Sequence, residues 1–182
     1  MAQKDTDEQL LRAFVKGDRD ALAQLAGRYE AQLLGLASGL LGSQTPACDA
    51  VQNAWVRVIR HGSTFNGSSS FKTWMYRITI NCCRDLQAKR KIKQDDETLK
   101  NETDSKQSPE QDLLNRERKQ VLHQSISKLN QAKRETLLLC YHDSMTHEKA
   151  AEVLDIPVGT LKSRLNAALN ELRKLLAEDN IS

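Results

Sequence analysis

Apolar residues recur every three or four positions along most of this chain, which is the spacing of one face of an α-helix. The longest such run spans residues 22–41, with Asp18 and Gly42 placed to cap its two ends. A shorter run over residues 10–15 precedes it. A third helix is expected over residues 46–61, with Thr45 as its cap and one apolar side formed by Val51, Ala54, Trp55, Val58 and Ile59. Only 8 Gly and 3 Pro interrupt the chain. The pattern therefore predicts an all-α protein.

A fourth helix, expected over residues 71–91, has two contrasting faces. The predicted buried stripe consists of Phe71, Trp74, Met75, Ile78, Cys82 and Leu86. The opposite face, which we expect to be exposed, holds Thr73, Arg77, Ile80, Arg84, Gln87 and Lys91. Three of these six residues are basic, so the face could follow a phosphate backbone. A solvated face that serves solubility is the alternative.

The loop before this helix, residues 62–70, is small and polar and contains one aromatic residue, Phe65. It is either a plain connector in which Phe65 packs against the core, or a loop that closes around an extruded base.

The last third of the chain predicts a pair of short helices over residues 146–176. Thr146 can cap the first, and Pro157 suits the first position of the second, where its missing N–H costs nothing. In the second helix, polar and basic residues off the apolar line occupy the first two turns: Lys162, Ser163, Arg164 and Asn166. This plan is typical of a helix-turn-helix DNA reader, with an ordinary helical corner as the alternative.

Charge is distributed unevenly although the chain carries only +3 in total. Residues 1–92 carry +5, residues 93–112 carry −4, and residues 113–182 carry +2. The acidic middle segment is almost free of large apolar residues, which is typical of a flexible linker. We therefore expect two small helical domains, 1–92 and 113–182, joined by a flexible acidic linker over 93–112. The second domain would hold four helices.

The remaining chemistry is limited. The four cysteines, Cys48, Cys82, Cys83 and Cys140, fit neither a zinc ribbon nor a disulfide framework, and indicate reduced thiols in the cytoplasm. Cys140 with His142 and His147 is not a recognised metal-ligand spacing, and no cofactor or catalytic site is expected. No apolar run of about 18 residues suggests membrane insertion.

Two stretches together resemble bacterial RNA polymerase sigma factors of the extracytoplasmic-function (ECF) type. Residues 69–78, SSFKTWMYRI, followed by Asn81, are similar to the family's FKTWLYRI…N signature. Residues 157–165, PVGTLKSRL, are similar to the PVGTVKSRL that opens its promoter-reading helix. Residues 47–55 also resemble the family's polymerase-docking helix. The resemblance extends from about residue 7 to residue 176.

The resemblance implies a sigma factor, which is not an enzyme. It would bind core RNA polymerase and direct promoter-specific transcription initiation. The first domain would correspond to σ2 and would dock on the β′ clamp through Asp49, Gln52 and Asn53. The residues implied for reading, melting or holding the −10 element are Phe65, Asn66, Ser68, Ser69, Thr73, Arg77, Arg84 and Lys91. The σ4-like second domain would sit on the β flap. It would read the −35 element through Thr160, Lys162, Ser163, Arg164 and Asn166. Many members of the family also bind an anti-sigma factor.

The chain departs from the family pattern at three positions. Cys48 stands where an acid is usual, Asp155 where glycine is common in the turn, and Ala150 where a branched aliphatic residue is usual. Trp74 is expected in the core, whereas Tyr76 lies at the edge of the stripe and could stack on a melted base. Two other functions remain open: a stand-alone helix-turn-helix regulator whose first domain dimerises or senses a signal, and an enzyme or redox-metal sensor.

Overall fold

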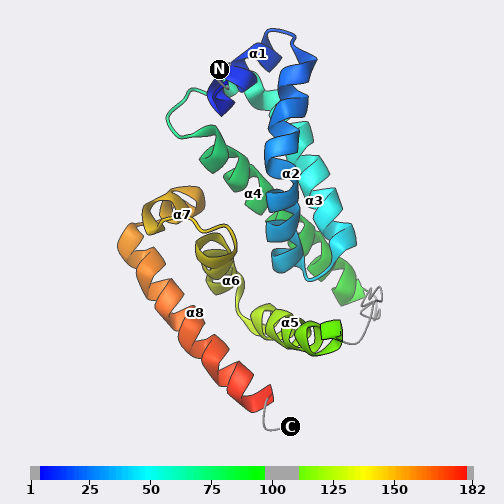
Figure 1. Ribbon diagram of the computed structural model, residues 1–182, viewed down its shortest axis with the longest axis vertical. Helices are drawn as coiled ribbons and strands as arrows, with labels where there is room; N and C mark the ends of the chain where they lie inside the picture. The colour runs from blue at the N-terminus through cyan, green and yellow to red at the C-terminus, as the bar shows by residue number, and fades with distance from the viewer. Residues whose placement is uncertain (1–4, 97–110, 180–182) are drawn as a thin grey trace.

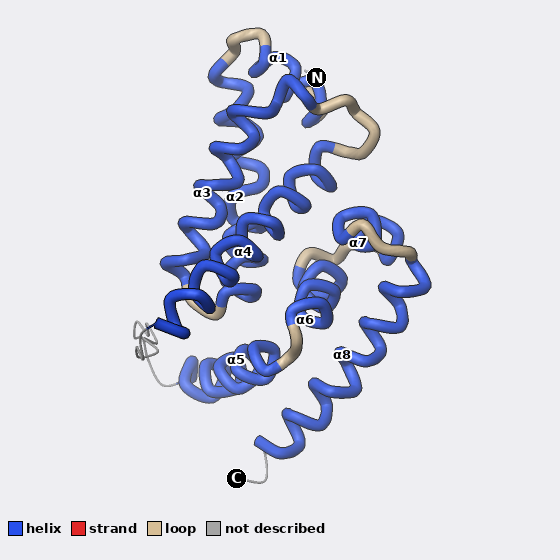
Figure 2. The backbone as a smooth tube through the Cα atoms, turned by 180° about the vertical axis from the view of Figure 1, so that it is seen from behind, coloured by secondary structure: helices blue, strands red, loops and turns tan. Residues whose placement is uncertain are grey.

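The computed structural model describes residues 5–96 and 111–179, and the side chains of residues 5–90, 92 and 120–177. All regular structure in these ranges is helical (Figures 1 and 2), which confirms the all-α prediction. The first domain contains α1 (Asp7–Val15), α2 (Arg19–Leu41), α3 (Gln44–His61), the 3₁₀ turn η1 (Gly62–Thr64) and α4 (Phe71–Asp96). The second contains α5 (Gln111–Lys128), α6 (Gln131–Leu137), the π-helical turn η2 (Leu138–His142), α7 (His147–Leu154) and α8 (Val158–Asp179).

Most helices begin and end at the capping residues that the sequence provides. Thr6 and Gln9 form the two reciprocal bonds of a capping box at α1. Asp18 accepts hydrogen bonds from two backbone N–H groups at the start of α2, and Gly42 ends that helix in the left-handed region with φ 78°. The predicted cap of α3, Thr45, is wrong: Thr45 lies inside the helix, and Ser43 occupies the cap position without making a side-chain hydrogen bond.

The first domain packs α2, α3 and α4 side by side, with α1 across one end (Figure 1). Its core is aliphatic around α2 and aromatic near the start of α4. The Phe71 ring lies between those of Tyr29 and Trp74, with centroid separations of 5.6 and 6.2 Å. Tyr29 also donates a hydrogen bond to Asp7, and Arg28 pairs with the same carboxylate at 2.6 Å, which fastens α1 to α2.

The second domain is held by a smaller apolar cluster and by one arginine. Leu129, Leu137, Leu165 and Ala168 bury their side chains between α5, α6 and α8. Arg134 donates to the carbonyl oxygens of Ile126, at 3.2 Å, and of Leu129, at 2.8 Å. These carbonyls belong to the unsatisfied end of α5, so Arg134 fixes the corner between α5 and α6.

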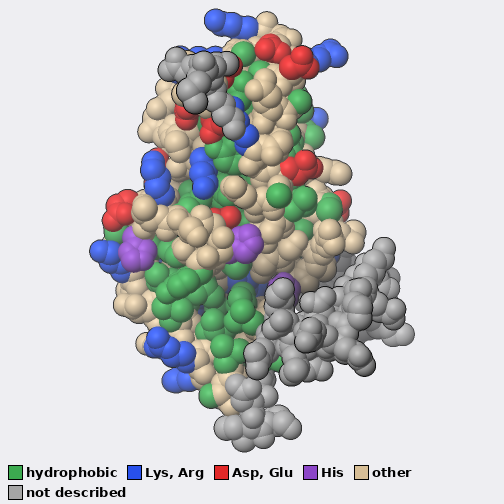
Figure 3. Space-filling view, viewed as in Figure 1, with side chains coloured by type: hydrophobic (Ala, Val, Ile, Leu, Met, Phe, Trp, Pro, Cys, Tyr) green, Lys and Arg blue, Asp and Glu red, His purple; other side chains and the backbone are tan. Residues whose placement is uncertain are grey.

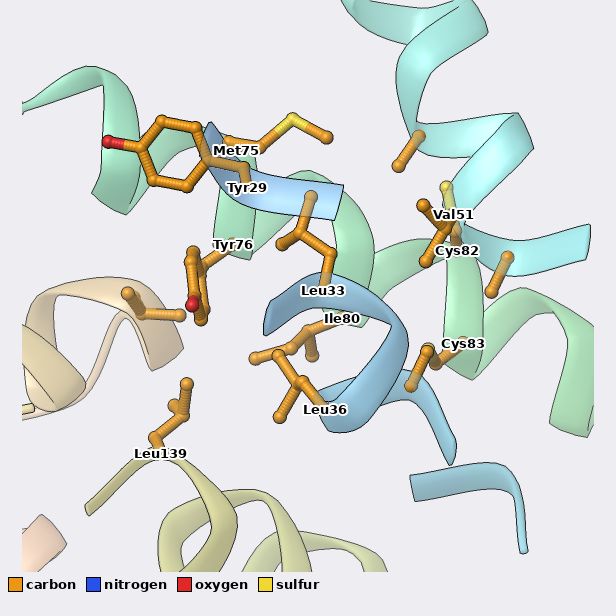
Figure 4. Close-up of a cluster of buried hydrophobic side chains, with 14 of the residues drawn as sticks. Tyr29, Leu33, Leu36, Val51, Met75, Tyr76, Ile80, Cys82, Cys83 and Leu139 are labelled. Atoms are coloured by element: carbon orange, nitrogen blue, oxygen red, sulfur yellow. The ribbon is translucent and has the colours of Figure 1, made fainter. Parts of the chain in front are cut away.

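The two domains share one continuous apolar cluster. Leu139 from η2 faces Leu36 of α2 and Ile80 of α4 in the close-up (Figure 4). Gln87 of α4 and Arg134 of α6 both donate to the carbonyl oxygen of Leu40, at 2.9 and 3.0 Å. The second domain therefore lies along one side of α2 and α4 (Figure 2).

This arrangement corrects the prediction of an exposed face on α4. Thr73 and Ile80 are each only 2% exposed, and Tyr76 is fully buried. Arg77 is half-buried, and Arg84 is exposed but paired with the second domain. The physical reason is that α6, η2 and α7 cover the side of the helix opposite its first-domain core. The side chain of Lys91 lies outside the described residues.

The helix ends also differ from the predicted linker. Helix α4 continues to Asp96 instead of ending near residue 91, and α5 begins at Gln111. The described helices thus reach into both ends of segment 93–112. Residues 97–110 lie outside the described part of the chain.

Candidate nucleic-acid and polymerase interfaces

The start of α8 presents the polar groups that were predicted to read the −35 element. Lys162, Ser163 and Asn166 are exposed, whereas Thr160 and Arg164 are half-buried. The Ser163 hydroxyl donates to the carbonyl oxygen of Thr160 at 2.9 Å, so it is held against the helix. The structure brings all five residues together on the first turns of one helix, which is the arrangement with which a recognition helix reaches base edges.

The turn between α7 and α8 depends on Asp155. This residue adopts φ 55° and ψ 51°, the left-handed conformation that favours glycine. The N–H of Asp155 donates to the carbonyl oxygen of Glu152 at 3.3 Å, and the N–H of Ile156 donates to that of Ala151 at 3.1 Å. These bonds close the end of α7 and set the direction in which α8 departs.

The loop before α4 is ordered by its own polar side chains. Asn66 accepts a hydrogen bond from the N–H of Ser68 at 3.0 Å, around Gly67 with φ 74°. Ser70 caps α4 by accepting from the N–H of Thr73 at 3.1 Å. Asn66 and Ser68 are exposed, and Ser69 is half-buried.

Phe65 in this loop packs as a connector residue would. Its ring is half-buried and lies 5.2 Å from the ring of Trp74, centroid to centroid. Trp74 is itself half-buried and in contact with the core, as predicted. The role of the loop in capturing a base stays a prediction.

The two described arginines of the predicted phosphate face are bound by the second domain. Arg84 donates from Nε and Nη2 to the two carboxylate oxygens of Glu135, at 2.8 and 2.7 Å. Arg77 donates from Nη2 to the carbonyl oxygen of Glu152 at 2.5 Å. An arginine is a cation at every ordinary pH, and hydrogen bonding to Glu135 raises the pKa of Arg84 further. Both guanidinium groups could bind phosphates, but in this packing Glu135 and the carbonyl oxygen of Glu152 accept their hydrogen bonds.

The exposed face of α3 holds the residues that were predicted to dock on polymerase. Asp49, Gln52 and Asn53 are all exposed. They are accompanied by two exposed apolar side chains, Val56 at 41% and Ile59 at 52%. The prediction that Ile59 belongs to the buried side of α3 is wrong.

Val56 and Ile59 are the residues of this face that sequence reasoning missed. Positions 52, 56 and 59 follow a four-then-three spacing, so they share one side of a helix. That spacing was the signal that could have found them. An apolar centre beside polar residues is typical of a protein-binding surface.

The cysteines and histidines form no second site in the described part of the chain. All four thiols are free there, and burial raises the pKa of Cys83 to about 12. Burial likewise raises the pKa values of Cys82 and Cys140, so these thiols are poor nucleophiles and metal ligands. Among the described residues no group of His, Cys, Asp and Glu could hold a metal ion. No described helix is long and apolar enough to span a bilayer.

Comparison with known proteins places both domains in one family. Residues 25–92 match the family model of Sigma-70 region 2, and residues 119–172 match that of Sigma-70, region 4. The RNA polymerase sigma-H factor of Pseudomonas aeruginosa is 30% identical over 97% of this chain and 96% of its own length. The chain belongs to the ECF group of the sigma-70 family. The ECF RNA polymerase sigma-E factor of Escherichia coli is also 30% identical, over 91% of each chain.

Two solved structures share this fold over most of their length. CnrH, in a complex with the cytosolic domain of CnrY, superposes with a TM-score of 0.75 at 24% identity, over 96% of this chain and 99% of that one. The sigma factor RpoE of Bartonella quintana, in a complex with the anti-sigma factor NepR, gives 0.69 at 24% identity, over 85% and 96%. The region 2 match contains the predicted docking and −10 residues, and the region 4 match contains the predicted −35 residues. The roles of individual residues in this sigma factor stay predictions.

Proposed function

We propose that this chain binds core RNA polymerase in the cytoplasm and directs it to promoters, without an active site of its own. Its first domain reads the −10 element and its second domain reads the −35 element. The observation that carries the proposal is the exposed cluster on the first turns of α8, within the region 4 match. That cluster provides base-reading chemistry on a chain whose other domain matches region 2.

Docking on polymerase belongs to α3. Asp49, Gln52 and Asn53 supply polar contacts to the β′ clamp. Val56 and Ile59, one to two turns further along the helix, supply apolar contacts to it. All five side chains are available in the closed packing of the two domains, because α3 lies on the side of the first domain away from α6 and α7 (Figure 1). A second contact, to the β flap, suits the apolar side chains gathered over α6 and α8 (Figure 3).

Reading of the −35 element belongs to α8. Arg164 is the group best suited to base recognition, since a guanidinium can donate two parallel hydrogen bonds to guanine. Lys162, Ser163 and Asn166 add hydrogen bonds to bases or phosphates. Thr160 lies in the first turn of α8, where backbone N–H groups favour a phosphate.

Reading of the −10 element belongs to the loop before α4 and to the helix itself. Asn66, Ser68 and Ser69 supply donors and acceptors for an extruded base beside Phe65. Thr73, Arg77, Arg84 and Lys91 follow on successive turns of α4 and suit the phosphate backbone. Because α6 and α7 cover part of this surface, DNA can reach it only when the second domain has moved away. The boundaries 1–92 and 113–182, with an acidic connection over 93–112, suit such a movement.

In vitro transcription tests the proposal. Core polymerase with this chain should start transcription at promoters that core polymerase alone does not use. The double variant Asp49→Ala/Gln52→Ala should lose co-purification with core polymerase. A matched control, Gln24→Ala/Glu30→Ala, changes the same kinds of side chain on the exposed side of α2 and should retain it. Sequence-specific DNA binding with no effect on initiation would instead identify a stand-alone regulator.

A further inference from the structure

We propose that Glu8 of α1 is a positioning residue for the −10 site: it holds the loop before α4, residues 62–70, in the shape that receives an extruded base. The inference rests on the proposed function and adds to that site a residue from outside the loop and outside α4. Helix α1 lies across the end of the first domain from which this loop emerges (Figure 1).

One side of α1 contacts both ends of the loop. At the far end, Oε1 of Glu8 accepts a hydrogen bond from the backbone N–H of Phe71 at 2.9 Å. At the near end, a Cβ atom on Gly62 would lie 3.3 Å from Cδ1 of Leu11 and 3.4 Å from Cγ2 of Val15. Positions 8, 11 and 15 follow a three-then-four spacing, so their side chains share one side of the helix. A single helix therefore fixes the separation between the two ends of the loop.

The Glu8 contact is separate from the cap that α4 already has. Ser70 accepts from the N–H of Thr73 at 3.1 Å, which satisfies one donor in the first turn of α4. Phe71 also lies in this turn, where backbone N–H groups have no partner within the helix. Its partner is Glu8, 63 residues earlier in the chain. Because the local cap can begin the helix alone, Glu8 adds the placement of the start of α4 relative to α1.

The position of Phe71 is transmitted to the loop through its ring. The ring of Phe71 lies 6.2 Å from that of Trp74, which lies 5.2 Å from that of Phe65, centroid to centroid. Phe65 is the aromatic residue proposed to lie beside the extruded base. Glu8 is itself anchored, because the carboxylate of neighbouring Asp7 is bound to α2 by an ion pair and a hydrogen bond. Loss of the Glu8 contact should therefore displace the ring on which Phe65 rests.

The kinetics of promoter opening by the holoenzyme test the proposal. The probe is a DNA duplex that the unmodified holoenzyme selects from a randomised library, with a fluorescent adenine analogue in the −10 element. The fluorescence rises when the analogue leaves the base stack, so it measures opening at saturating holoenzyme. Glu8→Ala should slow opening about fivefold, the factor that corresponds to the net contribution of one hydrogen bond. The affinity of the first, unopened complex should not change, because the loop receives a base only after the duplex opens.

Matched variants separate positioning from folding. Glu8→Gln keeps an oxygen that can accept from the N–H of Phe71, and it should recover most of the opening rate. Glu30→Ala removes an exposed glutamate from α2 and should open DNA at the unmodified rate. If Glu8→Ala loses helical circular dichroism, Glu8→Asp replaces it. This variant keeps the charge but is shorter by one methylene, so it should also slow opening.

Opening by the folded Glu8→Ala or Glu8→Asp variant at the rate of the Glu30→Ala control would overturn the proposal. An equal loss of affinity in the unopened complex would also overturn it, because that result identifies a purely structural role. Failure of Glu8→Gln to recover the rate would show that the hydrogen bond to Phe71 is not responsible. Absence of opening by the unmodified holoenzyme would instead contradict the proposed function.

Discussion

Arg84 and Glu135, which are 51 residues apart in the chain, form an ion pair with two N–O contacts, at 2.8 and 2.7 Å, between α4 and α6. The arginine side chain is 42% exposed and the glutamate side chain 4%. The pair is therefore asymmetric: in this packing Arg84 keeps part of its contact with solvent, whereas Glu135 is almost fully shielded from it. Removal of the Arg84 charge in this packing would leave a buried carboxylate without its cation.

Arg84→Gln should weaken holoenzyme binding to all promoters by the same factor. A phosphate contact carries no sequence information, and each one contributes about 0.7–0.9 to the slope of log affinity against log salt concentration. We expect the slope to fall by roughly that amount. Arg12→Gln, an exposed change of the same charge on α1, is the control. Promoter-selective loss in a salt titration would show that Arg84 reads sequence.

Arg164→Ala should weaken binding to a −35 element and relax preference at one base position. A bidentate arginine–guanine contact contributes about 1–3 kcal/mol of discrimination. Arg173→Ala removes the same side chain from an exposed site later in α8 and should leave the preference unchanged. Selection of binding sites from a randomised library would measure both, and an unaltered motif for the Arg164 variant would remove this residue from the recognition surface.

Asp155→Ala should lower the free energy of unfolding of the second domain by about 1 kcal/mol. The left-handed conformation is higher in energy for alanine than for aspartate or asparagine. Asp155→Gly should be at least as stable as the unmodified chain, since the relief of strain offsets the added freedom of the unfolded chain. Thermal unfolding of the three chains should therefore rank glycine at or above aspartate and aspartate above alanine. The reverse order of glycine and alanine would mean that φ at this position is not the controlling quantity.

Asp143 should make the packing of the two domains weaker as pH rises. Burial raises the pKa of this carboxyl above its ordinary value of 3.8, against the opposing effects of His142, of the Tyr76 hydrogen bond and of Lys72. An acid with a raised pKa in the folded state is stabilising only while protonated, so stability falls as pH increases through the raised value. Its second oxygen, Oδ2, is also buried without a partner among the described residues.

The variant Asp143→Asn tests this relation because it keeps an oxygen for the Tyr76 hydroxyl and removes the charge. It should be more stable than the unmodified chain near neutral pH, and the difference should shrink as pH is lowered toward the ordinary pKa of an aspartate. Denaturant unfolding at a series of pH values measures the difference. A gain that is the same at every pH would show that the charge of Asp143 is not responsible.

Local chemistry made part of this structure predictable from the sequence. Caps such as Thr6, Asp18 and Thr146 satisfy backbone groups a few residues away, so their neighbours suffice to identify them. The helix-turn-helix was predictable for the same reason, and the family comparison confirmed the fold and the family.

The environment of α4 was not predictable from its own pattern. A helical wheel divides a helix into two faces but does not say whether a distant segment covers the second one. The apolar side chains of Tyr76 and Ile80, outside the main stripe, were the available signal. Ile59 shows the opposite error, because an apolar residue beside the buried stripe was assigned to the core although it lies on the surface.

The π-helical turn η2 acts as a one-residue insertion between α6 and the helix-turn-helix. The N–H of Asp143 bonds back five residues, to the carbonyl oxygen of Leu138, at 3.2 Å. In an α-helix each residue advances the side-chain direction by about 100°. Removal of one residue, Tyr141 for example, would restore ordinary helical phase and rotate every later residue by that angle about the axis of α6. The orientation of the recognition helix α8 therefore depends on the number of residues in η2 as well as on their types.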